Sequence, residues 1–383
     1  MFQLIFYKIF PAENPFLFSH NGIPIAPSNN QIFISKIFHE IFNRTLQNRF
    51  LYEPVLFQIF NITQDAGFFV TLRPDKRMLM MESNSLYAVT VGFFDGVHCG
   101  HRYLLECLRK AAADRGLKSM IVTFPESPRQ ILRPECKVSL LNTPEDKIGR
   151  LQNCGIDVCQ VIHFTPELAS MDARSFMSEI LYGQLGVRCI VLGYDHKFGH
   201  DRITNLSTYR KIGDEIGIEV IPSEPLIWTG APVSSTRIKK NLECGYIREA
   251  TEMLGYRYSI NGIVVHGLKN GRKMGFPTAN LEPHCNILQI PANGVYAALA
   301  TVGGKTYKSM LNIGFRPTIN GDNTKLTIEA HLLDFDQDIY GEELSLSFVD
   351  YIRPERRFDS MEQLSAQLAD DREHINRTLS LTL

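Results

Sequence analysis

Apolar and amphipathic stretches alternate along the chain between residues 87 and 221. The short apolar run YAVTV (87–91) is followed by HRYLLECLRKAAADRG (101–116), in which Leu105 and Leu108 fall on one side of a helix. Further apolar runs and helical stretches follow in the same order with short connections. This alternation predicts a parallel sheet covered by helices, in which ligands bind beyond the carboxyl ends of the strands.

The pattern changes after about residue 255 to strand-like runs with a period of two and turn glycines. The run GVYAALATV (294–302) leads into Gly303-Gly304, a pair typical of a two-residue hairpin turn. Several short strands without intervening helices predict a small closed β-barrel. A final helix is expected from Ser360, because Gln363 stands three residues further on and completes a capping box.

The composition is that of a globular protein, and the length of 383 residues allows two domains. A net charge of −1 gives no bulk attraction to nucleic acid or to an anionic membrane, so a phosphate ligand needs a local cluster. No run of about 18 uncharged apolar residues predicts a membrane span. The eight cysteines are scattered without a C-x-x-C pair, which favours a reducing cytoplasm over disulfides or zinc.

Residues 1–81 differ from the rest of the chain. They hold thirteen of the 24 phenylalanines, in clumps that keep neither a helical nor a strand period. We expect this Phe-rich extension to lie outside the functional fold. The favoured interpretation is upstream sequence that is not translated in the cell, and the alternative is a genuine but unrelated extension.

One loop carries the strongest chemical signal in the chain. The apolar run 87–91 ends at Gly92, and His98, Gly100 and His101 follow just before the predicted helix. A helix N-terminus offers free N–H groups and partial positive charge to a phosphate, and imidazoles donate hydrogen bonds to its oxygens. The alternative is two loop histidines that share no task.

This loop resembles the H-x-G-H signature of the nucleotidyltransferase superfamily. The longer match G-x-F-D-G-V-H-x-G-H over residues 92–101 is similar to the adenylyltransferase half of the bacterial bifunctional riboflavin kinase/FAD synthetases. The resemblance implies a Rossmann-like nucleotidyltransferase domain. It also implies catalytic roles for His98 and His101, and ATP-phosphate contacts for Gly92, Phe94 and Gly100.

Two further loops resemble parts of the same family domain. Residues 191–202 match its G-x-D-F-x-F-G-x-x-R loop, which implies flavin contacts for Asp195, Phe198 and Arg202. The family's following glycine is replaced here by the segment 203–205, which reads Ile-Thr-Asn.

The loop TFPESPRQIL (123–132) supplies Phe124 as another expected flavin contact. The family usually reads T-F-x-P-H-P, and this chain has Ser127 in place of the histidine. This departure predicts weaker flavin or phosphate contacts without removing the reaction.

Residues 233–239 resemble the S-S-T-x-I-R segment that closes over the triphosphate. Hydroxyls, an arginine and a lysine at the start of a helix suit a phosphate clamp, and an ordinary Ser/Thr helix cap is the alternative. The expected ATP-binding residues in this segment are Ser234, Ser235, Thr236, Arg237 and Lys239.

The second domain carries HGLKNGRKMGFPTANL (266–281), a glycine-rich loop between strands. It resembles the riboflavin kinase motif G-R-x-x-G-F-P-T-A-N, which implies Mg²⁺ coordination by Thr278 and Asn280. Neutral oxygen ligands suit that hard cation. The residues expected at the ATP phosphates are Gly267, Gly271, Arg272, Gly275 and Pro277.

The strand TIEAHLLDF (327–335) places Ile328 and Ala330 on one face and Glu329 on the other. There the carboxylate of Glu329 is available as a general base for the riboflavin 5′-hydroxyl, and an exposed strand glutamate is the alternative. The matching E-x-H-L-L-D-F favours the base. Flavin contacts are expected from Arg316, Arg356 and Phe358, in the family-like segments NIGFRPT and RPERRF.

The resemblance covers about residues 86–376 and implies three segments. Residues 1–81 form the extension, 82–240 the FMN adenylyltransferase domain and 241–383 a riboflavin-kinase-like barrel with its C-terminal helix. The implied partners are small molecules: ATP, riboflavin, FMN and FAD, with Mg²⁺. Two alternatives stay open, namely a kinase with an impaired adenylyltransferase domain and a non-enzymatic flavin-binding regulator.

Overall fold

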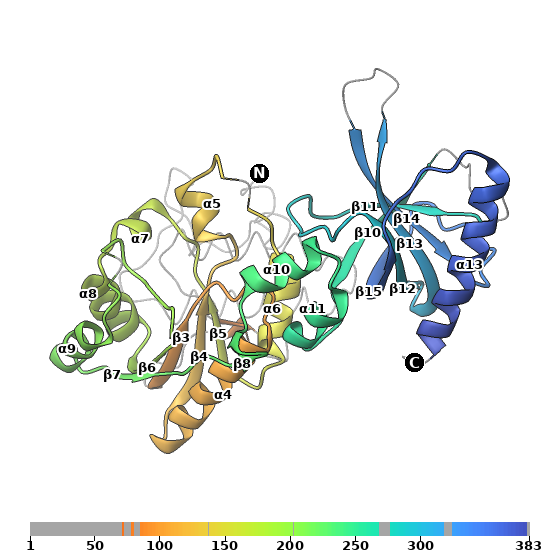
Figure 1. Ribbon diagram of the computed structural model, residues 1–383. Helices are drawn as coiled ribbons and strands as arrows, with labels where there is room; N and C mark the ends of the chain where they lie inside the picture. The colour runs from red at the N-terminus through yellow and green to blue at the C-terminus, as the bar shows by residue number, and fades with distance from the viewer. Residues whose placement is uncertain are drawn as a thin grey trace, which may run out of the picture. The chain divides into compact units, whose positions relative to one another are not determined.

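A seven-stranded sheet organises the first half of the computed structural model (Figure 1). All described residues belong to one compact unit that begins at Thr71. The structure describes residues 71–72, 78–79, 85–136, 138–201, 203–267, 276–317 and 324–380.

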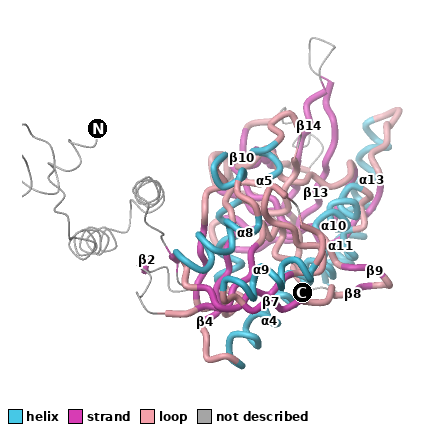
Figure 2. Tube along the Cα trace, turned by 90° about the vertical axis from the view of Figure 1, so that its left-hand side faces the viewer, coloured by secondary structure: helices cyan, strands magenta, loops and turns pink. Residues whose placement is uncertain are grey.

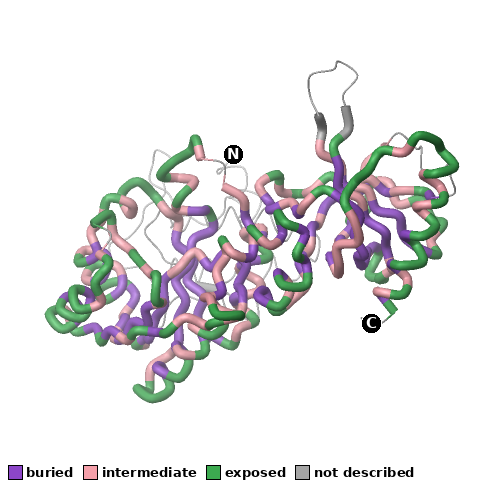
Figure 3. Tube along the Cα trace, viewed as in Figure 1, coloured by how far each residue is buried: buried purple, intermediate pink, exposed green. Residues whose placement is uncertain are grey.

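Five strands of this sheet are parallel and lie in the order β5-β4-β3-β6-β7, which confirms the predicted parallel sheet. Every residue of β3 and β5 is buried, as expected for strands covered on both faces (Figure 3). The strands are β3 (Tyr87–Val91), β4 (Lys118–Thr123), β5 (Val158–Val161), β6 (Val187–Leu192) and β7 (Glu219–Pro222).

Two very short strands extend the sheet beyond β5. The strands β1 (Thr71–Leu72) and β2 (Met78–Leu79) form an antiparallel pair, and β1 pairs antiparallel with β5. They belong to the region that the sequence pattern assigns to the extension. The other residues from 1 to 81 lie outside the described residues, so the dispensability of this region stays a prediction.

Helices connect the parallel strands. The longest, α4, packs against β3, β4 and β6 and buries Leu105 and Leu108, as the sequence pattern predicts. The helices are α4 (Cys99–Asp114), α5 (Pro128–Leu132), α6 (Pro144–Gln152), α7 (Pro166–Ser170), α8 (Ala173–Ser175), the π-helix η1 (Phe176–Gln184) and α9 (Leu206–Ile216).

Six antiparallel strands close into a barrel in the order β10-β11-β14-β13-β12-β15, which confirms the predicted barrel. Gly303 and Gly304 form the two-residue turn between β12 and β13 with φ of +55° and +76°. Strands β13 and β14 run side by side (Figure 2). The strands are β10 (Ser259–Val265), β11 (Ala279–Pro283), β12 (Gly294–Val302), β13 (Lys305–Pro317), β14 (Thr324–Leu332) and β15 (Glu343–Arg353).

Two helices precede the barrel, α10 (Ser235–Glu243) and α11 (Ile247–Leu254). Their buried side chains, including Leu242 and Leu254, belong to the same apolar core as Tyr258 of the barrel. The predicted domain boundary after residue 240 falls inside α10, and it stays a prediction.

The C-terminal helix α13 (Met361–Ser380) begins as the sequence predicts, because the Gln363 N–H donates to the Ser360 hydroxyl at 3.2 Å. Arg353 of β15 binds the carboxylate of Asp371 through Nε and Nη2, and Asp371 is only 3 % exposed. This buried ion pair fixes the helix against the barrel.

We expect Asp371→Ala to lower the thermal midpoint, because it removes the buried carboxylate that binds the half-buried Arg353 guanidinium. The expected loss of unfolding free energy is about 1.5–3 kcal/mol. Calorimetry of this variant and of the double variant Arg353→Met/Asp371→Leu measures it. A double variant less stable than the single one would show that the ion pair is not what destabilises Asp371→Ala.

We also expect a chain that starts at Met81 to keep its thermal midpoint and both of its activities, because the Phe-rich clumps lack a sustained period. A companion chain that starts at Thr71 retains β1 and β2. Loss of folding in both would show that residues 1–70 are structural. Loss in the shorter chain alone would assign that role to residues 71–80.

Candidate functional site

The loops after β3, β4 and β6 emerge at one edge of the sheet, because these three strands are parallel neighbours. Gly92 donates its N–H to the Val122 carbonyl at 3.0 Å, and the Thr123 hydroxyl donates to the Phe93 carbonyl at 3.4 Å. The structure therefore brings together the histidine loop and the Phe124 loop, as the sequence predicts, with the Gly193 loop beside them.

His98 and His101 form one unit at the start of α4. His98 is the N-cap residue, and its Nδ1 accepts a hydrogen bond from the His101 backbone N–H at 3.2 Å. The two imidazoles stack with ring centres 3.6 Å apart. Because Nδ1 of His98 is an acceptor, the proton of its neutral ring sits on Nε2, where it is available to a ligand. Nδ1 of His101 is buried and has no partner among the described residues.

Burial makes both imidazoles neutral at pH 7. It lowers the pKa of His98 to about 4 and shifts the pKa of His101 well below its ordinary value. Around pH 7 the pair therefore offers N–H groups rather than positive charge to a phosphate. The free N–H groups at the N-terminus of α4 add to this donor set.

Local packing leaves little room for a side chain at two glycines of the loop. A Cβ on Gly100 would stand 3.1 Å from the Val233 carbonyl oxygen and 3.2 Å from the His98 ring. A Cβ on Gly92 would stand 3.0 Å from the Phe94 ring, and that ring meets His101 edge-on at 5.2 Å. A side chain at either position would press on the His98 ring or on the Phe94 ring beside His101.

The segment before and within α10 makes contacts inside the protein. Ser234 is the N-cap residue and accepts from the Arg237 N–H, so the helix-cap alternative holds for this serine. The Ser235 hydroxyl donates to the Asp95 carbonyl at 2.8 Å, and Thr236 is exposed. The phosphate-binding role of the three hydroxyls stays a prediction.

The two cations of this segment also have protein partners. Arg237 donates to the carbonyl of Trp228 at 2.8 Å, in the hairpin of β8 (Ile227–Trp228) and β9 (Ala231–Pro232). Lys239 pairs with Asp95 at 2.5 Å. A phosphate clamp built from them would exchange these partners for phosphate oxygens.

The expected flavin residues lie around the same edge in different settings. Phe124 is buried and meets Phe164 edge-on, whereas Phe198 packs on Tyr209 at 4.8 Å between ring centres. Asp195 is exposed. Arg202 lies outside the described residues.

Ser127, which replaces the family's histidine, is buried and is the N-cap residue of α5. Its side chain makes no capping hydrogen bond. Its backbone carbonyl accepts from Gln130 and Ile131, so the local helix start does not depend on the side chain at this position.

Two residues at the site escaped sequence reasoning. Asp95, which appears in the sequence only as one position of the G-x-F-D-G motif, accepts a hydrogen bond from the Leu141 N–H at 2.8 Å. Lys147 is buried on α6, on the same face as Leu151. The four-residue spacing from that apolar leucine is the one signal that points to its burial.

The kinase motif lies on paired barrel strands. Asn280 of β11 stands opposite Glu329 of β14, and the Thr278 hydroxyl donates to Glu329 Oε2 at 3.5 Å. As predicted, Ile328 and Ala330 are buried in the barrel core, and Glu329 lies half-buried on the other face.

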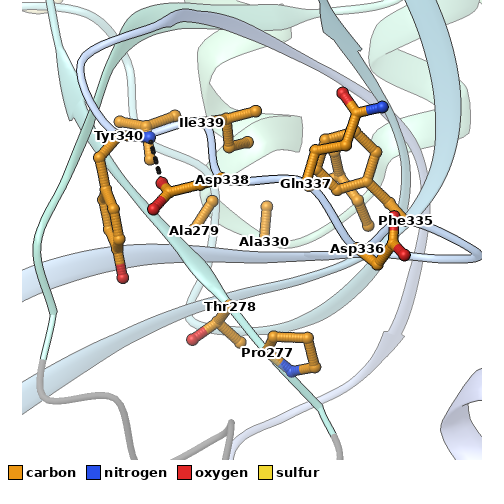
Figure 4. A pocket seen from close by; sticks show the side chains of 12 residues that line it. Pro277, Thr278, Ala279, Ala330, Phe335, Asp336, Gln337, Asp338, Ile339 and Tyr340 are labelled. Carbon is orange, nitrogen blue, oxygen red and sulfur yellow. Dashed lines mark hydrogen bonds between the residues drawn. The ribbon is translucent and has the colours of Figure 1, made fainter.

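A pocket of about 300 Å³ lies beside this motif (Figure 4). Thr278 and Pro277 line it from one side, and residues 335–340 line it from the other. Thr278 thus connects the pocket with the carboxylate of Glu329. The carboxylates of Asp336 and Asp338 at this pocket were not predicted.

The remaining expected kinase residues divide into two groups. Gly267 lies against the Asn280 amide, where a Cβ would collide with it, and the exposed guanidinium of Arg356 stands 5.1 Å from the Phe358 ring centre. Arg316 lies in β13, and its side chain is outside the described part. Gly271, Arg272 and Gly275 are also outside it.

A histidine-capped loop on a parallel sheet and a Thr-Asn motif on a closed barrel define a nucleotide-dependent transferase. The family model of FAD synthetase matches residues 80–237, and that of riboflavin kinase matches residues 254–379. The chain belongs to the bifunctional riboflavin kinase/FMN adenylyltransferase family.

Individual relatives agree with this assignment. The chain is 35% identical to the bifunctional riboflavin kinase/FMN adenylyltransferase of Listeria monocytogenes, over 74% of this chain and 89% of that protein. The Escherichia coli enzyme of the same name is 34% identical over 74% of this chain and 90% of its own length.

A solved structure from Streptococcus pneumoniae, described as a macrolide-efflux protein, is 32% identical with a TM-score of 0.70. The match covers 77% of this chain and 95% of that one. Within the residues that the structure describes, no helix is long and apolar enough to cross a membrane.

We expect His98→Ala and His101→Ala each to abolish most FAD formation from FMN. Each removes a donor aimed at developing phosphate charge, a loss of about 2–4 kcal/mol in the transition state. Chromatographic separation of FMN and FAD measures this, with the exposed His374→Ala as control. FMN formation from riboflavin should stay near normal, and an equal loss of both activities would contradict two separate sites.

Proposed function

We propose that this protein makes both flavin cofactors. Riboflavin and ATP give FMN and ADP at the barrel, and FMN and a second ATP give FAD and pyrophosphate at the sheet. The observation that carries the proposal is the stacked His98–His101 pair at the start of α4, on the same chain as the Thr278–Glu329 contact.

In the adenylyl transfer, an FMN phosphate oxygen attacks the α-phosphorus of ATP and the bond to pyrophosphate breaks. No covalent enzyme intermediate is needed, so the protein lowers the barrier by positioning and by hydrogen bonds to the developing charge. Nε2–H of His98, the His101 imidazole and the N–H groups at the start of α4 are the donors. Arg237 and Lys239 bind the leaving pyrophosphate after exchanging their protein partners.

In the kinase reaction, the riboflavin 5′-oxygen attacks the γ-phosphorus of ATP and ADP leaves. Glu329 accepts the hydroxyl proton. Thr278 orients the carboxylate through its hydroxyl, and this same residue lines the adjoining pocket. We infer that the nucleotide binds in this pocket with its terminal phosphate toward Thr278.

The family uses a divalent metal with ATP, and we infer Mg²⁺ held by Thr278 and Asn280. The residues fit, because Gly267 leaves room for the Asn280 amide where any side chain would collide with it. Among the described residues no cluster of three His, Cys, Asp or Glu offers a competing metal site. When bound, Mg²⁺ neutralises phosphate charge.

The setting of the enzyme follows from its thiols and substrates. All eight cysteines are free, which suits a reducing cytoplasm where riboflavin and ATP are supplied. The partners are these small molecules, and neither nucleic acid nor a membrane is needed.

A kinase with an impaired adenylyltransferase domain is the second candidate, because Ser127 and residues 203–205 depart from the family pattern. Incubation of the purified protein with riboflavin and Mg-ATP, followed by separation of FMN and FAD, tests both candidates. FAD is expected. FMN alone would favour the impaired enzyme, and neither product would favour a binding protein.

We expect Glu329→Gln to stop useful phosphorylation of riboflavin, because the amide keeps the shape but cannot accept the proton. Loss of a general base lowers the rate about 10²- to 10⁴-fold. Supplied FMN should still become FAD. The exposed Glu282→Gln on neighbouring β11 is the matched control. Parent-rate phosphorylation by Glu329→Gln would mean that another group is the base.

A further inference from the structure

Lys147 is a buried lysine that the proposed reactions leave unused. It lies on α6 and is only 2 % exposed, although lysines are almost never fully buried without a partner. Its ammonium donates to the Phe124 carbonyl at 2.5 Å and, more weakly, to the Pro125 carbonyl at 3.5 Å. It also stands 3.7 Å from the centre of the Phe93 ring.

These contacts join two different loops. Phe93 follows β3 and begins the loop that ends in the histidine pair, whereas Phe124 and Pro125 follow β4. The two strands are parallel neighbours, so both loops border the crevice at the carboxyl edge of the sheet. The Lys147 ammonium donates a hydrogen bond to the loop after β4 and makes a cation–π contact with the loop after β3. Together these two contacts fix the separation of the loops.

We propose that Lys147 is a positioning residue for adenylyl transfer, which holds the flavin-side loop at Phe124 in register with the phosphate-side loop at Phe93. The proposal rests on the adenylyltransferase activity proposed above and adds a residue to it. Lys147 acts through main-chain carbonyls and an aromatic ring, and it does not touch the reacting phosphates.

The charge on this lysine is sensitive to pH. Burial lowers its pKa to about 8. Two of its neighbours do not titrate there, because burial shifts the pKa of His101 well below its ordinary value and raises the pKa of Cys159 to about 12. The groups that face the ammonium are Asp95, Glu126, Glu145, Cys159 and His101.

Lys147→Met tests the proposal, because methionine fills similar space without the charge or the donors. The Phe124 carbonyl then loses its donor, so the thermal midpoint is measured beside the activity. We expect kcat/KM for FMN to fall about 10- to 100-fold, as a misplaced loop costs orientation. The KM for ATP and riboflavin phosphorylation should stay near their parent values. Lys110→Met, at an exposed site on α4, is the matched control.

A pH profile adds a readout that a purely structural lysine would not move. In the parent, kcat/KM for FMN should fall on the alkaline side around pH 8 as the ammonium loses its proton. Lys147→Met should lack this alkaline limb.

Each outcome is decisive. Parent-like kcat/KM for FMN in Lys147→Met would overturn the proposal. A parallel fall in the thermal midpoint and riboflavin phosphorylation would also overturn it, because the lysine would then act through fold stability. Absence of FAD formation in the parent itself would instead reject the proposed adenylyltransferase activity.

Discussion

The carboxylate of Asp95 is the contact on which the histidine loop depends. It accepts from the Leu141 N–H and pairs with the Lys239 ammonium, so it ties the loop to two other segments. On either side of it, Phe94 and Val97 adopt positive φ of +56° and +39°. Such backbone costs about 1–3 kcal/mol for each residue and persists only where the surroundings hold it. Because His98 follows Val97 directly, the Asp95 contacts support the backbone that carries the pair without touching either imidazole.

The electrostatics of this edge differ from those of an open cationic phosphate site. Burial keeps the His98–His101 pair neutral at pH 7, and Arg237 and Lys239 are bound to protein oxygens. Until a ligand draws the two cations away from these oxygens, what faces it is a set of oriented N–H groups in a buried setting. Oriented donors of this kind stabilise developing charge more strongly than they would in water, because they need not reorganise during the reaction. The loop glycines and the Asp95 anchor serve that orientation.

The architecture is readable from the sequence because it follows periodicity. The period of the apolar positions and the order of the segments predict the parallel sheet and the barrel. The Gly303-Gly304 pair alone predicts the turn between two barrel strands. The histidine pair is also readable, since its spacing places both rings at one helix start. Tertiary partners cannot be predicted in this way. Lys147 lies in the polar stretch NTPEDKIGRLQ (142–152), which is typical of a solvent-exposed helix. Nothing in that stretch indicates that its ammonium contacts a carbonyl some 22 residues away. The two-residue strands β1 and β2 carry too few positions for any period.

The contrast between main-chain and side-chain contacts explains why the departure at Ser127 need not disable the adenylyltransferase. The loop after β4 is held through main-chain carbonyls of Phe124 and Pro125, and α5 starts through backbone bonds to the Ser127 carbonyl. None of these contacts uses the side chain at position 127. A serine there removes one imidazole from the crevice and leaves the frame of the loop unchanged. The reaction needs that frame, because transfer between two bound phosphates depends first on how they are held against each other.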